Sequence, residues 1–145
     1  MSSRAEEAID LFNSGFNCAQ SVLGVFCEKY DINKGFALKI SSGLGAGFRS
    51  GEVCGAVSGA VLVIGLKYGQ QSADDTTSKS LCNSKTSEFM GMFKDKNNSV
   101  VCREILGFNL SVKEEYEHAQ RQNLFRTTCV EMVKSAVTLL EELGY

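Results

Sequence analysis

The sequence predicts an all-α fold: a single-domain, compact helical bundle of about six to eight helices, with a glycine-rich loop before a central apolar helix. Three observations predict it. Apolar residues recur at helical spacing along much of the 145-residue chain, strict apolar–polar alternation is absent, and the chain contains neither proline nor an Asn-Gly or Asp-Gly hairpin signal. No internal repeat, low-complexity tract or linker divides residues 1–145, so we expect one domain.

The first two helices follow from apolar spacing and from two punctuating residues. Residues 3–13 carry one apolar face, and Gly15 is expected to end that helix. Asn17 is typical of an N-cap for a second helix. The expected inward residues are Ala5, Ala8, Ile9 and Phe12 in the first helix, and Ala19, Val22, Leu23, Phe26 and Tyr30 in the second.

The middle of the chain predicts a short helix, a glycine loop and an apolar helix. A helix over 33–41 offers Phe36, Leu38 and Ile40 for packing. The apolar helix over 53–68 ends at Gly69. Its apolar run of 14 residues, 53–66, is short of the roughly 20 needed to span a bilayer, so no membrane span is predicted.

The second half predicts four more segments. Residues 73–95 are more polar and bring Cys82, Phe89 and Phe93 near one face. A cap cluster at 97–99 precedes a short helix over 100–106. Ser111 and Glu114 have capping-box spacing at the start of a helix over 111–121. The last helix, 124–143, has an apolar stripe of Val130, Val133, Val137 and Leu140.

Composition excludes some classes of partner and indicates a compartment. The net charge is −2 and the Lys and Arg residues are scattered, so we expect no nucleic-acid partner. The N-terminal residues carry acids where a signal peptide would carry basic and then apolar residues. We therefore expect a cytoplasmic protein.

Six cysteines are many for such a protein. They are Cys18, Cys27, Cys54, Cys82, Cys102 and Cys129. Because the cytoplasm keeps thiols reduced, this number favours metal binding or redox chemistry over a disulfide framework. The alternative is that each is a small buried hydrophobe.

The glycine-rich loop does not match a nucleotide-binding motif. Neither Gly43 nor Gly45 begins a G-x-G-x-x-G fingerprint, and no Gly-Lys-Ser/Thr follows as in a P-loop. Gly51, Gly55 and Gly59 are instead spaced four apart, which on a helix makes a flat strip for close packing. We expect this strip to face the domain's own core.

Three cysteines fall near predicted helix starts, where amide groups and the helix dipole lower a thiol pKa: Cys18, Cys54 and Cys102. Cys129 lies early in the last predicted helix, beside its apolar stripe. No Cys-x-x-Cys motif is present, so a shared cysteine site would have to be assembled from distant helices.

Four stations of the sequence resemble one known family. They are Gly15-Phe16-Asn17-Cys18-Ala19-Gln20, Cys54-Gly55-Ala56-Val57-Ser58-Gly59, Cys102-Arg103-Glu104-Ile105-Leu106-Gly107, and Cys129. Together they resemble the C-GCAxxG-C-C family, whose members are described as redox-active, from about residue 5 to residue 143. In this chain the second station reads Cys-Gly-Ala, whereas the family name gives its first two letters in the other order. The resemblance assigns the family's cysteines to Cys18, Cys54, Cys102 and Cys129 and leaves Cys27 and Cys82 as packing residues.

Other polar residues are candidate supports. Arg49 and Arg103 neighbour motif cysteines and could stabilise a thiolate, although an ordinary surface role is the simpler interpretation of each. Asn17 and Ser58 could donate to sulfur. His118, the only histidine, is expected on a solvated face.

These observations predict a redox-active protein that uses Cys18, Cys54, Cys102 and Cys129 for thiol–disulfide exchange or electron transfer, with Cys18 or Cys54 attacking first. As an enzyme it would be a thiol oxidoreductase. The supporting residues are Asn17, Arg49, Gly55, Gly59 and Arg103. The partner is then a redox protein or a small thiol or disulfide. One alternative is an iron–sulfur cluster or zinc held by the same four cysteines, and the dithiol version needs no cofactor. Another is a non-catalytic helical interaction module, such as a homodimer that meets through the glycine strip.

Overall fold

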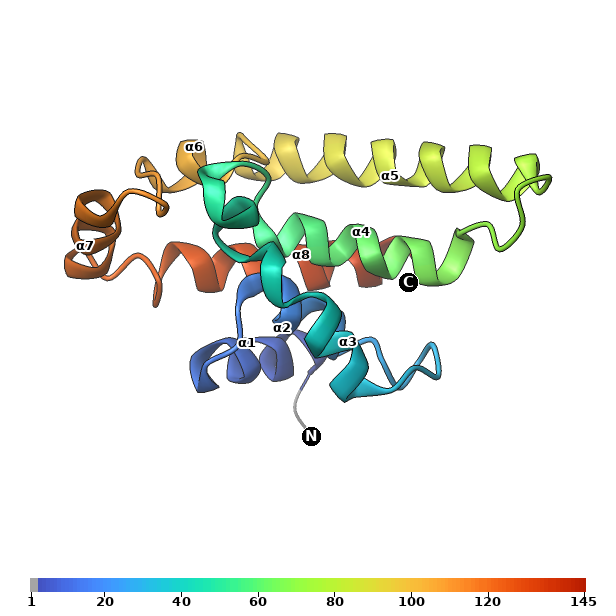
Figure 1. Ribbon diagram of the computed structural model, residues 1–145, viewed down its shortest axis with the longest axis horizontal. Coiled ribbons are helices and arrows are strands. Elements are labelled where there is room, and N and C mark those ends of the chain that lie inside the picture. Colours follow the sequence, from blue (N-terminus) through green and yellow to red (C-terminus); the bar gives the residue numbers. More distant parts are fainter. Residues whose placement is uncertain (1–2) are drawn as a thin grey trace.

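The computed structural model describes residues 3–145, which form eight α-helices, one 3₁₀ turn (Ser42–Leu44) and one irregular turn (Gly47–Gly51). Figure 1 shows their arrangement. The helices are α1 (Arg4–Ser14), α2 (Cys18–Gly24), α3 (Lys34–Ile40), α4 (Gly55–Tyr68), α5 (Thr76–Asn97), α6 (Cys102–Leu106), α7 (Lys113–Arg121) and α8 (Thr128–Glu142). The all-α prediction is confirmed, and the number of helices lies within the expected range.

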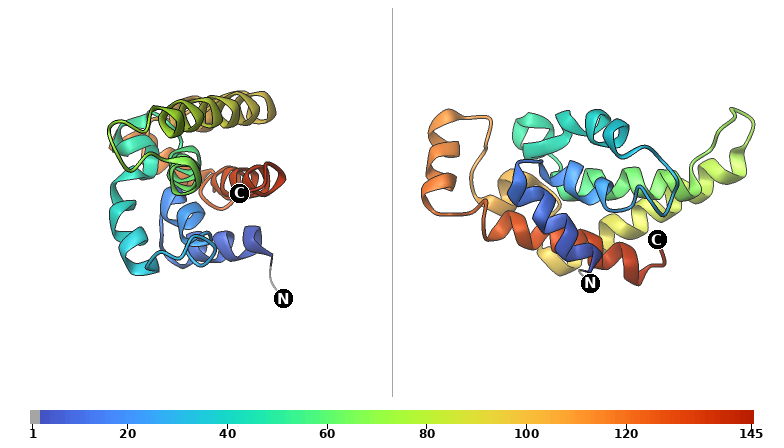
Figure 2. Two further views of the ribbon diagram at one scale, coloured as in Figure 1. Left: turned by 90° about the vertical axis from the view of Figure 1, so that its right-hand side faces the viewer. Right: turned by 90° about the horizontal axis from the view of Figure 1, so that it is seen from below.

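Three long helices, α4, α5 and α8, run along the length of the molecule, and Figure 2 shows them from the end and from below. The helix α4 is central, because it contacts α2, α5 and α8. The helix α1 packs on α8 and α2. Within residues 3–145, no helix is both long enough and apolar enough to cross a membrane.

The first two helices begin as the sequence predicts. Ser3 caps α1 in a reciprocal capping box with Glu6, and Gly15 ends the helix with a φ of 124°. Asn17 caps α2 in the same way with Gln20. The two helices are therefore bounded by local hydrogen bonds that the sequence carries within a few residues.

The core surrounds α4. Residues 55–60, Val63 and Ile64 of this helix are buried, as a helix that is apolar on all sides should be. Phe89 and Phe93 of α5 are fully buried against the same cluster, as is Val137 of α8. The central apolar helix of the prediction is thus the element around which the core forms.

The glycines of α4 allow α2 to approach closely. A Cβ added at Gly59 would lie 2.7 Å from the carbonyl oxygen of Ala19, and one at Gly55 would lie 3.0 Å from the Cβ of Cys18. These two glycines therefore face the chain's own core, as expected, and are not free for a partner helix. Gly51 differs from the prediction, because it lies outside α4 with a φ of +72° and faces Asn109.

Four expectations about the helices were wrong. Phe36 and Ile40 are 61% and 52% exposed, because α3 buries only Ala37. The helix α2 ends at Gly24, so Phe26 is buried from a turn. The Ser111–Glu114 capping box does not form, because the Ser111 side chain bonds to Asn109 instead. The last helix begins at Thr128, four residues later than predicted.

Candidate functional site

A short backbone bridge brings together two cysteines that are far apart in the chain. The amide of Cys54 donates to the carbonyl of Val100 (2.7 Å), and the amide of Cys102 donates to the carbonyl of Glu52 (2.6 Å). The two bonds flank one antiparallel β-bridge, and each cysteine follows a bridge residue. Because side chains alternate along extended backbone, both thiols leave the bridge on the same face.

Cys18 is held by the cap of its helix and by the packing of α2 on α4. It is the first residue of α2 and follows Asn17. The Asn17 side chain accepts from the amide of Gln20 (2.8 Å) and donates to the carbonyl of Ser42 (2.9 Å). On the α4 side, Gly55 leaves room for Cys18 at the contact described above. The start of α2 is therefore held by the Asn17 hydrogen bonds on one side and by its packing on α4 on the other.

Cys129 reaches the same region from α8, of which it is the second residue. Its amide donates to the carbonyl of Leu124 (3.0 Å), which orders the turn before the helix. Its side chain belongs to a second hydrophobic cluster, separate from the core around α4, together with Cys102, Leu106 and Leu110. Figure 1 shows α6 and the start of α8 at the end of the molecule that carries α7.

Cys18, Cys54, Cys102 and Cys129 line one cavity of about 30 Å³. Cys54 and Cys102 are each 6% exposed, Cys129 is 8% exposed, and Cys18 is partly buried. Apart from the thiols, the walls are apolar. They are formed by Ala46, Ile105, Leu106, Leu110 and Met132. The structure thus brings together the four cysteines that the sequence singles out, and hereafter we call this space the cysteine cavity.

The four thiols of the cysteine cavity differ in pKa, because their surroundings differ. Burial raises the pKa of Cys54 to about 11 and that of Cys102 to about 12. A hydrogen bond with Cys129, together with burial, raises the pKa of Cys18 well above its usual value. The same hydrogen bond outweighs burial at Cys129 and lowers its pKa. Cys129 is therefore the cavity thiol that ionises first.

This order of ionisation reverses the expectation from helix starts. All four cysteines do lie at such starts, since Cys54 is itself the N-cap of α4 and Cys102 is the first residue of α6. At Cys54 the amides of Ala56 and Val57 do lower the pKa, but burial outweighs them. Cys129, which the sequence placed beside the core stripe, is the thiol with the lowered pKa, because it accepts from a neighbouring thiol.

The expected supporting residues act on the backbone and not on sulfur. Asn17 uses its side chain for the α2 cap, and the Ser58 hydroxyl donates to the carbonyl of Gly55 (3.1 Å). Arg103 donates to the carbonyl of Gly51 (2.9 Å) and pairs with Glu52 (3.0 Å). These residues therefore hold the elements that carry the cysteines.

Arg49 and His118 lie on the surface. Arg49 is exposed in the irregular turn with a φ of 58°. His118 is exposed on α7 and stacks on Phe108, with ring centroids 5.9 Å apart. Neither residue lines the cysteine cavity.

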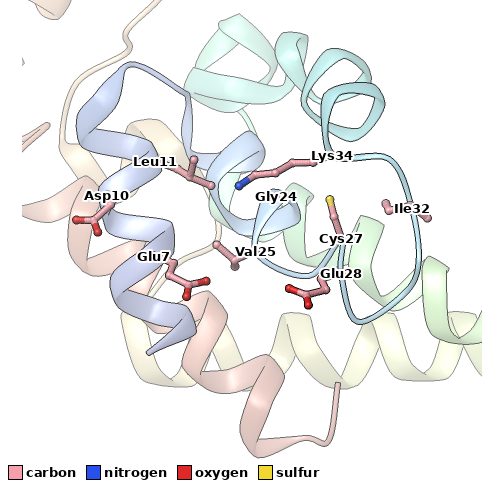
Figure 3. Close-up of a pocket in the computed structure, with 9 residues that line it drawn as sticks. All are labelled: Glu7, Asp10, Leu11, Gly24, Val25, Cys27, Glu28, Ile32 and Lys34. Carbon is pink, nitrogen blue, oxygen red and sulfur yellow. The ribbon is translucent and has the colours of Figure 1, made fainter. Parts of the chain in front are cut away.

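The two remaining cysteines lie elsewhere. Cys27 is 3% exposed, and its thiol donates to the carbonyl of Leu23 (3.5 Å). It borders an open groove of about 460 Å³, shown in Figure 3, where Glu7 and Glu28 come from opposite sides. Cys82 is partly buried on α5 against the main core. Neither contributes to the cysteine cavity, which agrees with their interpretation as packing residues.

The cysteine cavity as arranged does not form a metal-ligand set. Among residues 3–145, no three His, Cys, Asp or Glu side chains are placed to hold one metal ion. The six cysteines are all free thiols in this structure.

Comparison with known proteins gives one match. The family model described as "Putative redox-active protein (C_GCAxxG_C_C)" matches residues 16–143. The matched range includes all four cysteines of the cavity and leaves out α1. No curated protein and no solved structure matches the chain.

Proposed function

Because the chain belongs to the C_GCAxxG_C_C family, we propose that its cysteine cavity is a reversible dithiol–disulfide centre in which Cys18 and Cys129 are the pair that oxidises. One observation carries the proposal: the side chains of these two residues line one small cavity together with two further thiols, and each shifts the ionisation of the other. Two thiols that face the same small cavity need little movement to form an S–S bond.

The pair supplies two electrons and two protons. Cys129 is the sulfur that reacts first with an oxidant, since its thiolate forms most readily. Cys18 then resolves the intermediate, and one S–S bond replaces two S–H groups. Cys54 and Cys102 stay protonated at neutral pH, because their pKa values of about 11 and about 12 lie far above it.

The redox setting is part of the same proposal. Thiol reductants of the cytoplasm would return the pair to the dithiol state, and a small thiol or a redox protein would supply the electrons. Oxidation would link the start of α2 to the start of α8, two helices that already contact each other. The proposed disulfide would thus join two helices that are already packed together.

A redox titration tests this function. The full chain is brought to equilibrium, without oxygen, with mixtures of reduced and oxidised dithiothreitol, and its free thiols are counted. We expect two of the six thiols to disappear in one two-electron step, with a slope of about 30 mV per tenfold change in the ratio. The Cys129→Ala variant should lose this step, and the matched control Cys82→Ala should keep it.

Two results would count against the proposal. One is that all six thiols persist in the most oxidising mixture. The other is that Cys129→Ala oxidises like the wild type. Stoichiometric iron or zinc in protein purified without oxygen would instead favour the metal alternative.

A further inference from the structure

The size of the cysteine cavity limits what can react inside it. Its volume is about 30 Å³. A water molecule occupies about 30 Å³ in the liquid, and a cavity needs only about half of that to hold one. The cavity therefore has room for one or two atoms of the size of oxygen beside the thiols.

An external disulfide does not fit this space. Disulfide exchange requires the attacking sulfur, the attacked sulfur and the leaving sulfur to meet, and each incoming sulfur carries at least one carbon. Cys54, Cys102 and Cys129 are no more than 8% exposed. A disulfide of glutathione or of a protein would thus have to open the cavity before it could reach any of these three sulfurs. Cys18 is partly exposed, but its pKa is raised well above the usual value, so it forms little of the thiolate that attacks a disulfide.

Part of the cavity wall comes from the loop that contains Ala46 and the irregular turn; we call it the tied loop, because its far end is bonded to α6. Ala46, which lines the cavity, has a φ of 53°, and Phe48 and Arg49 also have positive φ values. Non-glycine residues hold this conformation only where their surroundings impose it. Within the loop the amide of Glu52 donates to the carbonyl of Gly47 (3.0 Å), and the bonds of Arg103 to Gly51 and Glu52 fasten the far end of the loop to α6.

We propose that the fast oxidant of the cysteine cavity is hydrogen peroxide, admitted because it is small, while bulky hydroperoxides and disulfides react slowly, only when the cavity opens. This inference rests on the proposed dithiol function. The volume of the cavity, the depth of its thiols and the tied loop all favour a molecule with two heavy atoms. Peroxide also accepts two electrons at once, which matches the two that a dithiol pair gives.

The reaction balances without a further reactant. The Cys129 sulfur attacks one oxygen of the peroxide, so that an S–O bond forms and the O–O bond breaks. The leaving hydroxide takes up the proton that Cys129 released and becomes water. The Cys18 sulfur then displaces the second oxygen from Cys129, which leaves as a second water with the Cys18 proton. Two thiols are oxidised to one disulfide, and one peroxide is reduced to two waters.

The test compares two hydroperoxides of different size. The reduced full chain is mixed with hydrogen peroxide or with cumene hydroperoxide, and the rate of thiol loss is followed by quenching and mass measurement. The apolar walls would favour cumene hydroperoxide by affinity, so a slower reaction with it isolates the effect of size. We expect hydrogen peroxide to react at least tenfold faster and to give a product lighter by two hydrogen atoms.

A wider cavity should weaken this selectivity. Leu110→Ala removes part of a wall, so the rate with cumene hydroperoxide should rise several-fold relative to that with hydrogen peroxide. Leu139→Ala is the matched control, because this leucine is buried in α8 but does not line the cavity. If Leu110→Ala does not fold, the rate ratio of the wild type still decides the question.

The outcomes separate this inference from the proposed function. Equal or faster reaction with cumene hydroperoxide would overturn peroxide selectivity, even if the titration with dithiothreitol shows the two-electron step. Equal selectivity in Leu110→Ala and in the wild type would overturn the role of the cavity walls. Failure of the dithiothreitol titration itself would remove the dithiol pair, and with it both proposals.

Discussion

The molecule buries cysteine in two different ways. Cys27 and Cys129 are 3% and 8% exposed, so burial alone does not distinguish them. The Cys27 thiol donates to a backbone carbonyl one turn earlier and packs in the main core, and burial raises its pKa although nearby Lys34 lowers it. Around Cys129 the thiol meets a second thiol, and that contact lowers its pKa.

The comparison indicates that a candidate redox thiol is distinguished by a neighbouring thiol, and not by how deeply it is buried. A single buried thiol behaves as a small apolar side chain with a suppressed ionisation. A pair of thiols shares a proton through a hydrogen bond, so one ionises more readily and the other less readily. The following predictions begin with the change that should separate the two environments most.

Removing each thiol in turn should give the largest contrast. In Cys129→Ala the first thiolate to form on raising the pH should disappear, because burial by itself raises the pKa of each remaining cavity thiol, including that of Cys18 once Cys129 is gone. In Cys27→Ala that first step should persist. The ultraviolet absorption of the thiolate, followed against pH, measures both. If the first thiolate ionisation remained in Cys129→Ala, the proposed contrast between Cys129 and Cys27 would be contradicted.

The close packing of α2 on α4, which positions Cys18 beside the cysteine cavity, should depend on Gly59. In Gly59→Ala the new Cβ would press on the backbone of Ala19, so we expect the free energy of unfolding to fall by about 1–3 kcal/mol. Gly65→Ala, on the same helix, meets nothing within 4 Å and should be neutral or more stable by up to about 1 kcal/mol. Urea unfolding compares the two. Equal stability of both variants would contradict the close approach of α2 to α4.

The donor to Cys129 should set its ionisation. In Cys18→Ala burial remains as the opposing effect, so the pKa of Cys129 should rise above its ordinary value. Cys18→Ser keeps a donor and should show a smaller rise. The same titration of absorbance gives both values. An unchanged first step in Cys18→Ala would mean that another group holds the Cys129 thiolate.

Stability should fall on the alkaline side. The folded-state pKa values of Cys54 and Cys102, about 11 and about 12, lie above the ordinary value of 9.0. Above pH 9 the unfolded chain therefore releases protons that the folded chain retains, which favours unfolding progressively up to about pH 11. Urea unfolding between pH 8 and pH 11 should show this loss. Cys54→Ala should have a shallower slope than the wild type.

The smallest effect should come from Arg103. This side chain is 45% exposed and bonds to Gly51 and Glu52, so Arg103→Lys should cost less than about 1 kcal/mol of stability. The ionisation of Cys102 should not change, because the arginine contacts the loop and not the sulfur. A shift in the alkaline titration of this variant would show that the guanidinium acts on the thiol after all.

Local signals in the sequence predicted the elements with local causes. Asn17 could be recognised as a cap, because its partner Gln20 is three residues away. The four cysteines could be singled out from their neighbours along the chain. Ser111 has the same kind of spacing, yet its hydroxyl bonds to Asn109, a choice that the loop geometry determines.

The pairing inside the cysteine cavity could not be predicted from the sequence. Cys54 meets Cys102 through a bridge between two short extended segments, and neither segment carries strand periodicity. Cys129 gains its neighbour only after α8 packs on α2. The expectation that Cys18 or Cys54 attacks first rested on helix starts, which are visible in a sequence, whereas burial by distant helices, which raises the pKa values of both thiols, is not.

The most direct test of the account is to map the disulfide. The full chain is oxidised to the loss of two thiols, the remaining thiols are blocked after unfolding, and the linked peptides are identified by mass spectrometry. We predict a bond between Cys18 and Cys129, with Cys27, Cys54, Cys82 and Cys102 recovered as blocked thiols. A bond between Cys54 and Cys102, or one that includes Cys27 or Cys82, would contradict the assignment of the redox pair.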